Sequence, residues 1–249
     1  MRIAYLLEEP AISATTRIIA AQTNALLARG HDVRIVDELQ GFVPAHGEIV
    51  VPAHSDVVQK NPIVADGLFR EKLPRENNPL RVLIAGASQT EAKGIGEAYG
   101  AAAHARWFHQ TLELVRVSPW APSREEPLDD VQEFHVALSE SEMSRLMHSC
   151  DVVVAGNRRE DPLSLTTLEA LASGLVCVLT NTDAHQALGA GAALFAPVDN
   201  AVELGEKLIE VLEDRDLRQR LRTRGREVAE QFRAANVVTR LESLLASKS

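Results

Sequence analysis

From Leu80 to the end of the chain, short runs of aliphatic and β-branched residues alternate with segments whose apolar residues have helical spacing. Such alternation is typical of βαβ units, in which helices connect parallel strands and cover the sheet. The predicted strands cover residues 81–85, 112–118, 131–136, 151–155, 175–180 and 193–197. The predicted fold class is therefore α/β, with a doubly wound, Rossmann-like parallel sheet in this part of the chain.

Periodicity and capping residues mark the helices between these strands. Ser139 and Glu142 have the spacing of a capping box, in which each side chain bonds a backbone N–H at the start of a helix. Leu168, Leu171 and Leu175 keep the spacing of a buried helix face. The predicted helices cover residues at about 91–105, 140–148, 165–173, 201–213, 214–230 and 234–246.

The N-terminal segment begins with one further βαβ unit. Strands are predicted at 2–7 and 32–36, and the helix between them, at 15–29, stops at Gly30. A single unit of this kind is too small to bury its own core. We therefore expect it to pack on the rest of the chain or on another chain, which makes a homo-oligomer an expected possibility.

A connector separates this unit from the regular part of the chain. Residues 38–79 are rich in Pro and Gly, and within them only 48–51 and 56–59 have strand-like composition. The predicted organisation is a reduced N-terminal βαβ region at 1–55, an interdomain linker at 56–79, a main domain at 80–232 and a C-terminal helix at 233–249.

Charge and cysteine usage exclude several classes of function. The formal net charge of −9 argues against non-specific binding of nucleic acid and against adsorption to an anionic membrane surface. No segment approaches the run of about 20 apolar residues that a membrane-spanning helix requires, so no transmembrane segment is predicted. Cys150 and Cys177 lie in apolar contexts, which favours buried thiols in a reducing, cytoplasmic location.

The histidines do not indicate a metal site. Eight histidines are present, yet none forms an H-x-x-x-H pair and none clusters with cysteine. The sequence therefore predicts neither a bound metal nor a cofactor.

Two loops are the best candidates for a ligand site. In open parallel sheets ligands bind at the carboxyl ends of strands, where helix N-termini offer N–H groups to phosphate. Residues 86–94 (GASQTEAKG) follow the strand at 81–85, and residues 156–168 (GNRREDPLSLTTL) follow the strand at 151–155. Both loops are rich in small and charged residues and lead into predicted helices.

The second loop and its helix resemble the donor-site signature of group 1 (family 4) retaining glycosyltransferases of the GT-B type. LEALASG is intact at Leu168–Gly174, and Asp161 and Glu169 have the family's spacing of two acids. The resemblance implies that Glu169 holds the ribose of a nucleotide and that Asp161, or Glu160 in its place, lies against the donor sugar. It also implies that the backbone N–H groups of Thr166, Thr167 and Leu168 face the sugar and the diphosphate.

The first loop resembles the family's diphosphate-binding loop, with one departure. Gly86, Ser88 and Lys93 fall in the matching stretch, and the resemblance implies that Lys93 contacts the diphosphate. Ala87 and Ser88 stand where the family carries an Arg. Loss of a charged hydrogen bond to phosphate costs about 1.5–3 kcal/mol, and Arg158 or Arg159 in the neighbouring loop would compensate.

Other segments are similar to the same family. FHVALSESEM at 134–143 resembles the segment beside the nucleobase, which makes His135 a candidate donor contact. Residues 26–36, 57–69 and 202–232 also match, and the helix at 234–246 is expected to cross back to the first domain. The fold expected from the resemblance is GT-B-like, with a Rossmann-like donor domain and a truncated N-terminal acceptor-side region.

The resemblance implies a glycosyltransferase that moves a sugar from a nucleoside-diphosphate sugar to an unknown acceptor in glycan or polysaccharide biosynthesis. The reaction would retain the configuration of the sugar and use no metal. Lys93 and helix N-terminal amides would stabilise the charge that develops on the departing diphosphate. The alternative is a non-catalytic, glycosyltransferase-like module that binds a nucleotide or a partner, which the missing Arg and the short first region favour. An epimerase or a phosphorylase of the same architecture matches LEALASG less well.

Overall fold

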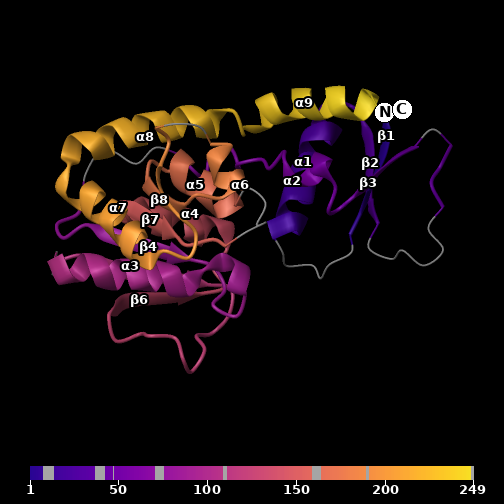
Figure 1. The fold of residues 1–249 in the computed structure, drawn as a ribbon. Helices are drawn as coiled ribbons and strands as arrows, with labels where there is room; N and C mark the ends of the chain where they lie inside the picture. Colours follow the sequence, from indigo (N-terminus) through magenta and orange to yellow (C-terminus); the bar gives the residue numbers. More distant parts are fainter. Residues whose placement is uncertain are drawn as a thin grey trace. The chain divides into compact units, whose positions relative to one another are not determined.

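The computed structural model of the chain describes residues 1–7, 14–36, 43–46, 48–70, 76–108, 111–158, 164–188 and 191–247. The chain forms two compact units. Unit 1 consists of Met1–Asp66 together with Glu230–Ser249, and unit 2 consists of Gly67–Ala229 (Figure 1). The two units are described separately below.

Unit 2 contains a sheet of six parallel strands in the order β6-β5-β4-β7-β8-β9. The chain passes from the central strand β4 to β5 and then to the edge strand β6. It then returns to the other side of β4, where it forms β7, β8 and β9. This is the doubly wound order, so the predicted fold class is confirmed. The strands are β4 (Arg81–Ala85), β5 (Glu113–Ser118), β6 (Val131–Val136), β7 (Val152–Ala155), β8 (Val176–Thr180) and β9 (Leu194–Ala196).

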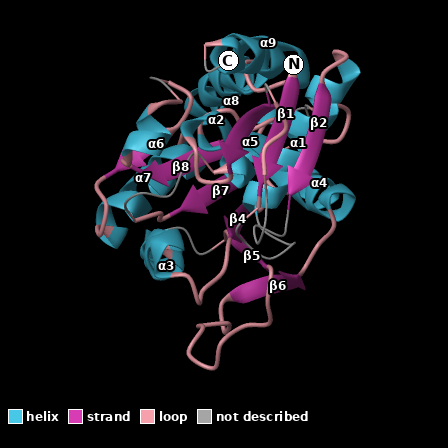
Figure 2. Ribbon diagram, turned by 90° about the vertical axis from the view of Figure 1, so that its right-hand side faces the viewer, coloured by secondary structure: helices cyan, strands magenta, loops and turns pink. Residues whose placement is uncertain are grey.

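Helices cover both faces of this sheet, and α3 and α5 lie on opposite sides of the strands (Figure 2). Successive residues of the central strands are buried, as expected for a sheet covered on both faces. On one face α3 and α7 pack closely. A Cβ added at Gly205 in α7 would lie only 2.9 Å from the Cβ of His104 in α3, so the contact depends on glycine at position 205. The helices of unit 2 are α3 (Ile95–Phe108), α4 (Glu140–Ser149), α5 (Leu165–Ala172), α6 (Asp183–Gln186), α7 (Ala201–Glu213) and α8 (Arg215–Glu230), preceded by the short 3-10 helix η1 (Glu91–Lys93).

The predicted capping box at the start of α4 is confirmed. The backbone N–H of Glu142 donates to Ser139 Oγ at 3.4 Å, and the backbone N–H of Ser139 donates to Glu142 Oε2 at 2.8 Å. The helix predicted at 91–105 is divided, because Gly94 adopts φ +54° between η1 and α3. Local sequence signals therefore locate the long helices of unit 2 to within a few residues, whereas the short helix α6 was not predicted.

Unit 1 is built on a three-stranded parallel sheet in the order β2-β1-β3. The C-terminal helix α9 packs on α1, and it buries Val237, Val238, Leu241 and Leu245. The small N-terminal region thus obtains part of its core from the end of the chain. The elements are β1 (Arg2–Leu6), α1 (Ala14–Ala28), β2 (Asp32–Val36), β3 (Glu48–Pro52), α2 (Asp56–Gln59) and α9 (Ala234–Ala246).

The strand-like character assigned to residues 56–59 is wrong, because the segment forms helix α2. The side-chain amide of Gln22, fully buried in α1, donates to the carbonyl oxygen of Asn61 at 2.8 Å and to that of Val57 at 3.2 Å. These bonds satisfy carbonyl groups in and just after the short helix, where no further turn supplies N–H donors. Local composition could not reveal a partner 39 residues away.

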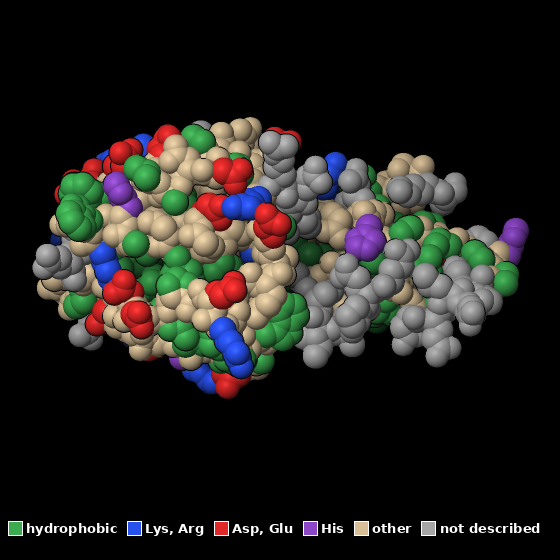
Figure 3. All heavy atoms as spheres, turned by 60° about the horizontal axis from the view of Figure 1, so that its bottom comes forward, with side chains coloured by type: hydrophobic (Ala, Val, Ile, Leu, Met, Phe, Trp, Pro, Cys, Tyr) green, Lys and Arg blue, Asp and Glu red, His purple; other side chains and the backbone are tan. Residues whose placement is uncertain are grey.

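Charged side chains of both signs are interspersed on the face shown in Figure 3.

Among the described residues, no helix is both long enough and apolar enough to cross a membrane. Cys150 and Cys177 are both buried and form no disulfide.

An ion-pair network fastens the beginning of unit 2 to α8. Glu76 accepts hydrogen bonds from Arg218 at 2.8 and 2.9 Å and from Arg222 at 2.7 Å. Both arginines are buried, at 6% and 9% exposure. The hydrogen bond from Arg218 is the largest cause that lowers the pKa of Glu76 to about 2, and burial alone would raise it. The folded state therefore favours the ionised carboxylate.

Replacement of Glu76 by Gln should lower the free energy of unfolding of unit 2 by about 2 kcal/mol near neutral pH, because two buried guanidinium groups lose their carboxylate. Since the pKa of Glu76 in the folded state lies below the ordinary glutamate value of 4.5, the stabilisation by Glu76 is complete above that pH and is lost as the pH falls towards about 2. Urea unfolding at several pH values measures both effects.

Glu210→Gln is the matched control, because Glu210 forms an exposed ion pair with Lys207. We expect this variant to unfold within about 0.5 kcal/mol of the wild type. A difference between Glu76→Gln and wild type that stays constant down to acid pH would contradict the assignment.

Candidate functional site

The two predicted ligand loops meet at the switch point of the sheet, where the chain passes from the β4 side to the β7 side. The first loop begins at Gly86, whose backbone N–H donates to the Val117 carbonyl oxygen at 3.1 Å. Gly86 adopts φ +134°, a conformation that side chains rarely permit. Ala87, which stands where the family carries an Arg, is buried at 6% exposure.

Backbone contact between two glycines joins the loops. A Cβ at Gly94 would overlap the carbonyl oxygen of Gly156, and Gly94 already has φ +54°. The backbone N–H of Arg158 donates to the carbonyl oxygen of Ala92 at 2.9 Å and adds a second link. The contact requires glycine at position 94, so the approach of the two loops is determined at the level of the backbone.

Arg158 lies between the loops and contacts three carboxylates. Its Nε is 3.0 Å from Glu97 Oε1 and 3.1 Å from Asp199 Oδ1, and its Nη1 is 2.7 Å from Glu91 Oε1. Three negative charges thus surround one positive charge at the start of α3. The predicted role of Arg158 in donor binding stays a prediction, and it requires exchange of these carboxylates for a phosphate group.

Lys93 and Ser88 occupy the first loop as the sequence predicts. Lys93 ends η1 next to Gly94 and is half-buried. The Ser88 hydroxyl donates to Glu126 Oε2 at 2.8 Å. Its proton is therefore directed towards the protein interior.

Sequence reasoning missed Glu126 and its partner Arg116. The Glu126 carboxylate accepts from Arg116 Nε at 2.7 Å and from the Tyr99 hydroxyl at 3.0 Å, and both charged side chains are almost completely buried. The available signal was Arg116 itself, because an arginine in the middle of the apolar stretch LELVRVS needs a buried acid. The sequence did not show which acid it was.

The second loop leads into α5, which carries the predicted ribose-binding acid. Glu169 is 1% exposed, Thr167 is 3% exposed and Leu168 is fully buried, whereas Thr166 is half-buried. All four side chains belong to the first five residues of the helix. The structure thus brings Glu169, Thr166, Thr167 and Leu168 to the start of α5, beside the second loop.

Of the three further candidates, His135 alone belongs to the described residues. Asp161 and Glu160, the predicted sugar-binding acids, lie outside the described residues, as does Arg159. His135 lies near the carboxyl end of β6, at the edge of the sheet, and its Nε2 is 3.0 Å from Glu133 Oε2. Among the described residues, no group of three or more His, Cys, Asp or Glu side chains is arranged to hold a metal ion.

Substitution of Gly94 by Ala should destabilise unit 2 by about 3 kcal/mol or more, because the new methyl group overlaps the Gly156 carbonyl and φ is positive. Gly96→Ala is the control, since no atom lies within 4 Å of its added methyl group. Thermal unfolding should show Gly96→Ala equal to or slightly above wild type. Equal unfolding temperatures for the two variants would show that the loops do not depend on the glycine contact.

Comparison with known proteins finds one family match within unit 2. Residues 121–228 match the family described as "Glycosyl transferases group 1". No curated protein sequence matches the chain.

Solved structures show the same fold. The C-terminal domain of LpcC, a glycosyl transferase group 1 family protein from Francisella tularensis, aligns with a TM-score of 0.57 at 18% identity, over 68% of this chain and 97% of that one. A GtfA/B complex aligns with a TM-score of 0.61 at 17% identity, over 80% of this chain and 40% of that chain. Anabaena Alr3699/HepE, solved with UDP and glucose, aligns with a TM-score of 0.61 at 14% identity, over 99% of this chain and 72% of that one. The chain therefore has the GT-B fold, and residues 121–228 match the group 1 glycosyltransferase family.

Proposed function

We propose that the chain transfers a sugar from a nucleoside-diphosphate sugar to an acceptor. The observation that carries the proposal is the pair of loops joined at Gly94 and Gly156, within a unit that has the group 1 domain. Their position at the carboxyl ends of β4 and β7 is where open parallel sheets bind nucleotides.

Charge distribution supports a diphosphate as the leaving group. Lys93 contributes a positive charge in the first loop, and the N-terminus of α5 directs backbone N–H groups towards the second. Negative charge develops on the diphosphate oxygens as the bond to the sugar breaks, and fixed donors stabilise it. In this proposal neither a metal nor a cofactor takes part.

Glu169 is proposed to bind the ribose of the donor. A carboxylate accepts hydrogen bonds from vicinal hydroxyl groups, and burial strengthens such bonds because water is excluded. Asp161 or Glu160 is proposed to contact the hydroxyl groups of the sugar, and the reaction is proposed to retain the configuration of the sugar. Because the HepE structure was solved with UDP, UDP is the first nucleotide to test.

Replacement of Glu169 by Gln should weaken nucleotide binding at least about tenfold, which corresponds to about 1.4 kcal/mol. Titration calorimetry with UDP, GDP and dTDP measures the affinities. Glu113→Gln is the control, because Glu113 begins β5 at the opposite edge of the sheet from the loops. Binding that is equal in Glu169→Gln and wild type would contradict the ribose assignment, even if the wild type binds a nucleotide.

The contacts of Arg158 favour a second candidate function, that of a non-catalytic module. Its guanidinium group contacts Glu91, Glu97 and Asp199, and Ala87 supplies no replacement charge. A site with this charge distribution binds a diphosphate less tightly than one with an available arginine. If the wild type binds none of UDP, GDP and dTDP, the result would support the non-catalytic module and contradict the transferase proposal.

The setting of the reaction is part of the same proposal. The acceptor is a glycan or a glycan precursor, and the protein acts in the cytoplasm, which agrees with its two buried thiols. Self-association through unit 1 is a further proposal, which light scattering would test.

A further inference from the structure

A buried acid links three segments around the first loop. The Glu126 carboxylate accepts hydrogen bonds from Ser88 at 2.8 Å, from Tyr99 at 3.0 Å and from Arg116 Nε at 2.7 Å. These residues belong respectively to the loop after β4, to α3 and to β5. One carboxylate therefore holds the first loop, the helix that follows it and the neighbouring strand.

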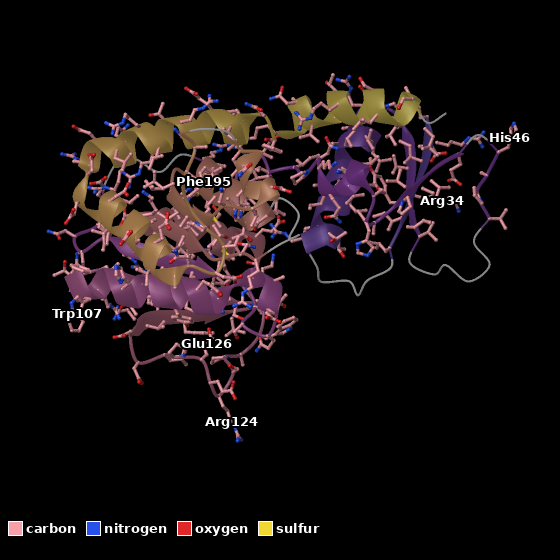
Figure 4. The ribbon with its side chains drawn as sticks, viewed as in Figure 1. Arg34, His46, Trp107, Arg124, Glu126 and Phe195 are labelled. Atoms are coloured by element: carbon pink, nitrogen blue, oxygen red, sulfur yellow. The ribbon has the colours of Figure 1, made fainter. Side chains whose placement is uncertain are left out.

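Glu126 reaches this position from the long connection between β5 and β6. Residues 119–130 join two adjacent parallel strands without a helix, although such connections usually contain one. Arg124 extends outward at the tip of this connection, whereas Glu126 lies closer to the sheet (Figure 4). A second contact comes from the Gln89 side-chain amide, which donates to the Ala121 carbonyl oxygen at 3.3 Å. The connection therefore supports the loop that begins at Gly86.

Arg116, which belongs to strand β5, holds the Glu126 carboxylate in place. Its side chain is fully buried, its Nη1 donates to the carbonyl oxygens of Ile84 and Val117, and it lies over the ring of Phe134. Those two carbonyl groups belong to the ends of β4 and β5 that face the site. The guanidinium group thus ties Glu126 to the strands from which the first loop begins.

The electrostatics of the cluster keep Glu126 ionised. Burial alone would raise the pKa of Glu126, but the hydrogen bond from Ser88 and the charge of Arg116 outweigh it, so the pKa is lowered. Burial and the Glu126 charge raise the pKa of Tyr99, so its hydroxyl stays protonated and donates. Ser88 has one hydroxyl proton, and the geometry directs it to Glu126 rather than to a ligand.

We propose that Glu126 is a positioning residue of the donor site, which holds the loop from Gly86 to Thr90 in the conformation that receives the diphosphate. The inference rests on the proposed function. Ser88 acts through Glu126 and is not itself a phosphate ligand. A loop that is held in its bound conformation loses less conformational entropy when the ligand binds, so the affinity rises.

Ser88→Ala and Tyr99→Phe form a matched pair of variants that tests the inference. Each removes one hydrogen bond to Glu126 and leaves the ion pair with Arg116 intact, but only Ser88→Ala releases the loop. Calorimetric titration of the full chain with UDP, GDP and dTDP should show affinity about three- to tenfold weaker for Ser88→Ala, with an unfolding temperature within about 2 °C of wild type.

Tyr99→Phe should show the opposite pattern, with a lower unfolding temperature and unchanged nucleotide affinity. Ser88→Thr keeps the hydroxyl group and should restore most of the affinity. Equal affinities for Ser88→Ala and wild type, or equal losses in Ser88→Ala and Tyr99→Phe, would overturn the positioning role while the proposed function stands. A wild type that binds none of the three nucleotides would instead refute the proposed function, and the inference with it.

Discussion

Backbone contact between Gly94 and Gly156 is the constraint on which the arrangement of the site depends. The first loop and the start of α3 approach the second loop so closely that neither glycine can carry a side chain without displacement of the other segment. The contact lies where the chain changes from one side of the sheet to the other. It therefore brings two loops from distant parts of the sequence to the edge where open α/β sheets bind ligands.

Charge balance around this contact differs from that of a simple phosphate site. Arg158 is surrounded by three carboxylates, and Lys93 is the positively charged residue of the first loop. The buried charge pair of Arg116 and Glu126 contacts the same loop through Ser88 and contributes no net charge. In the proposed function, diphosphate binding would therefore rely on backbone N–H groups and on loop geometry more than on the number of cations.

Much of the fold and part of the candidate site were predictable. The strands of unit 2, the capping box at Ser139 and the two loops follow from local periodicity and from the rule that ligands bind at carboxyl ends of strands. Glu169 was singled out because its neighbours resemble a family motif, and its role in the site stays a prediction. Arg116 and Glu126 were missed. Arg116 carried a signal, as a charge within an apolar strand, but Glu126 belongs to a connection with no regular pattern.

The sequence by itself determined most of the strands and the long helices and where the ligand loops begin, because hydrophobic periodicity is a local property. Only the tertiary structure decided which charges meet. Ser88 and Glu126 are 38 residues apart, Arg158 and Glu97 are 61 apart, and the Arg29–Glu242 pair that links the end of α1 to α9 spans 213 residues. Such pairs depend on how the chain returns through the sheet, and no window of neighbouring residues contains that information.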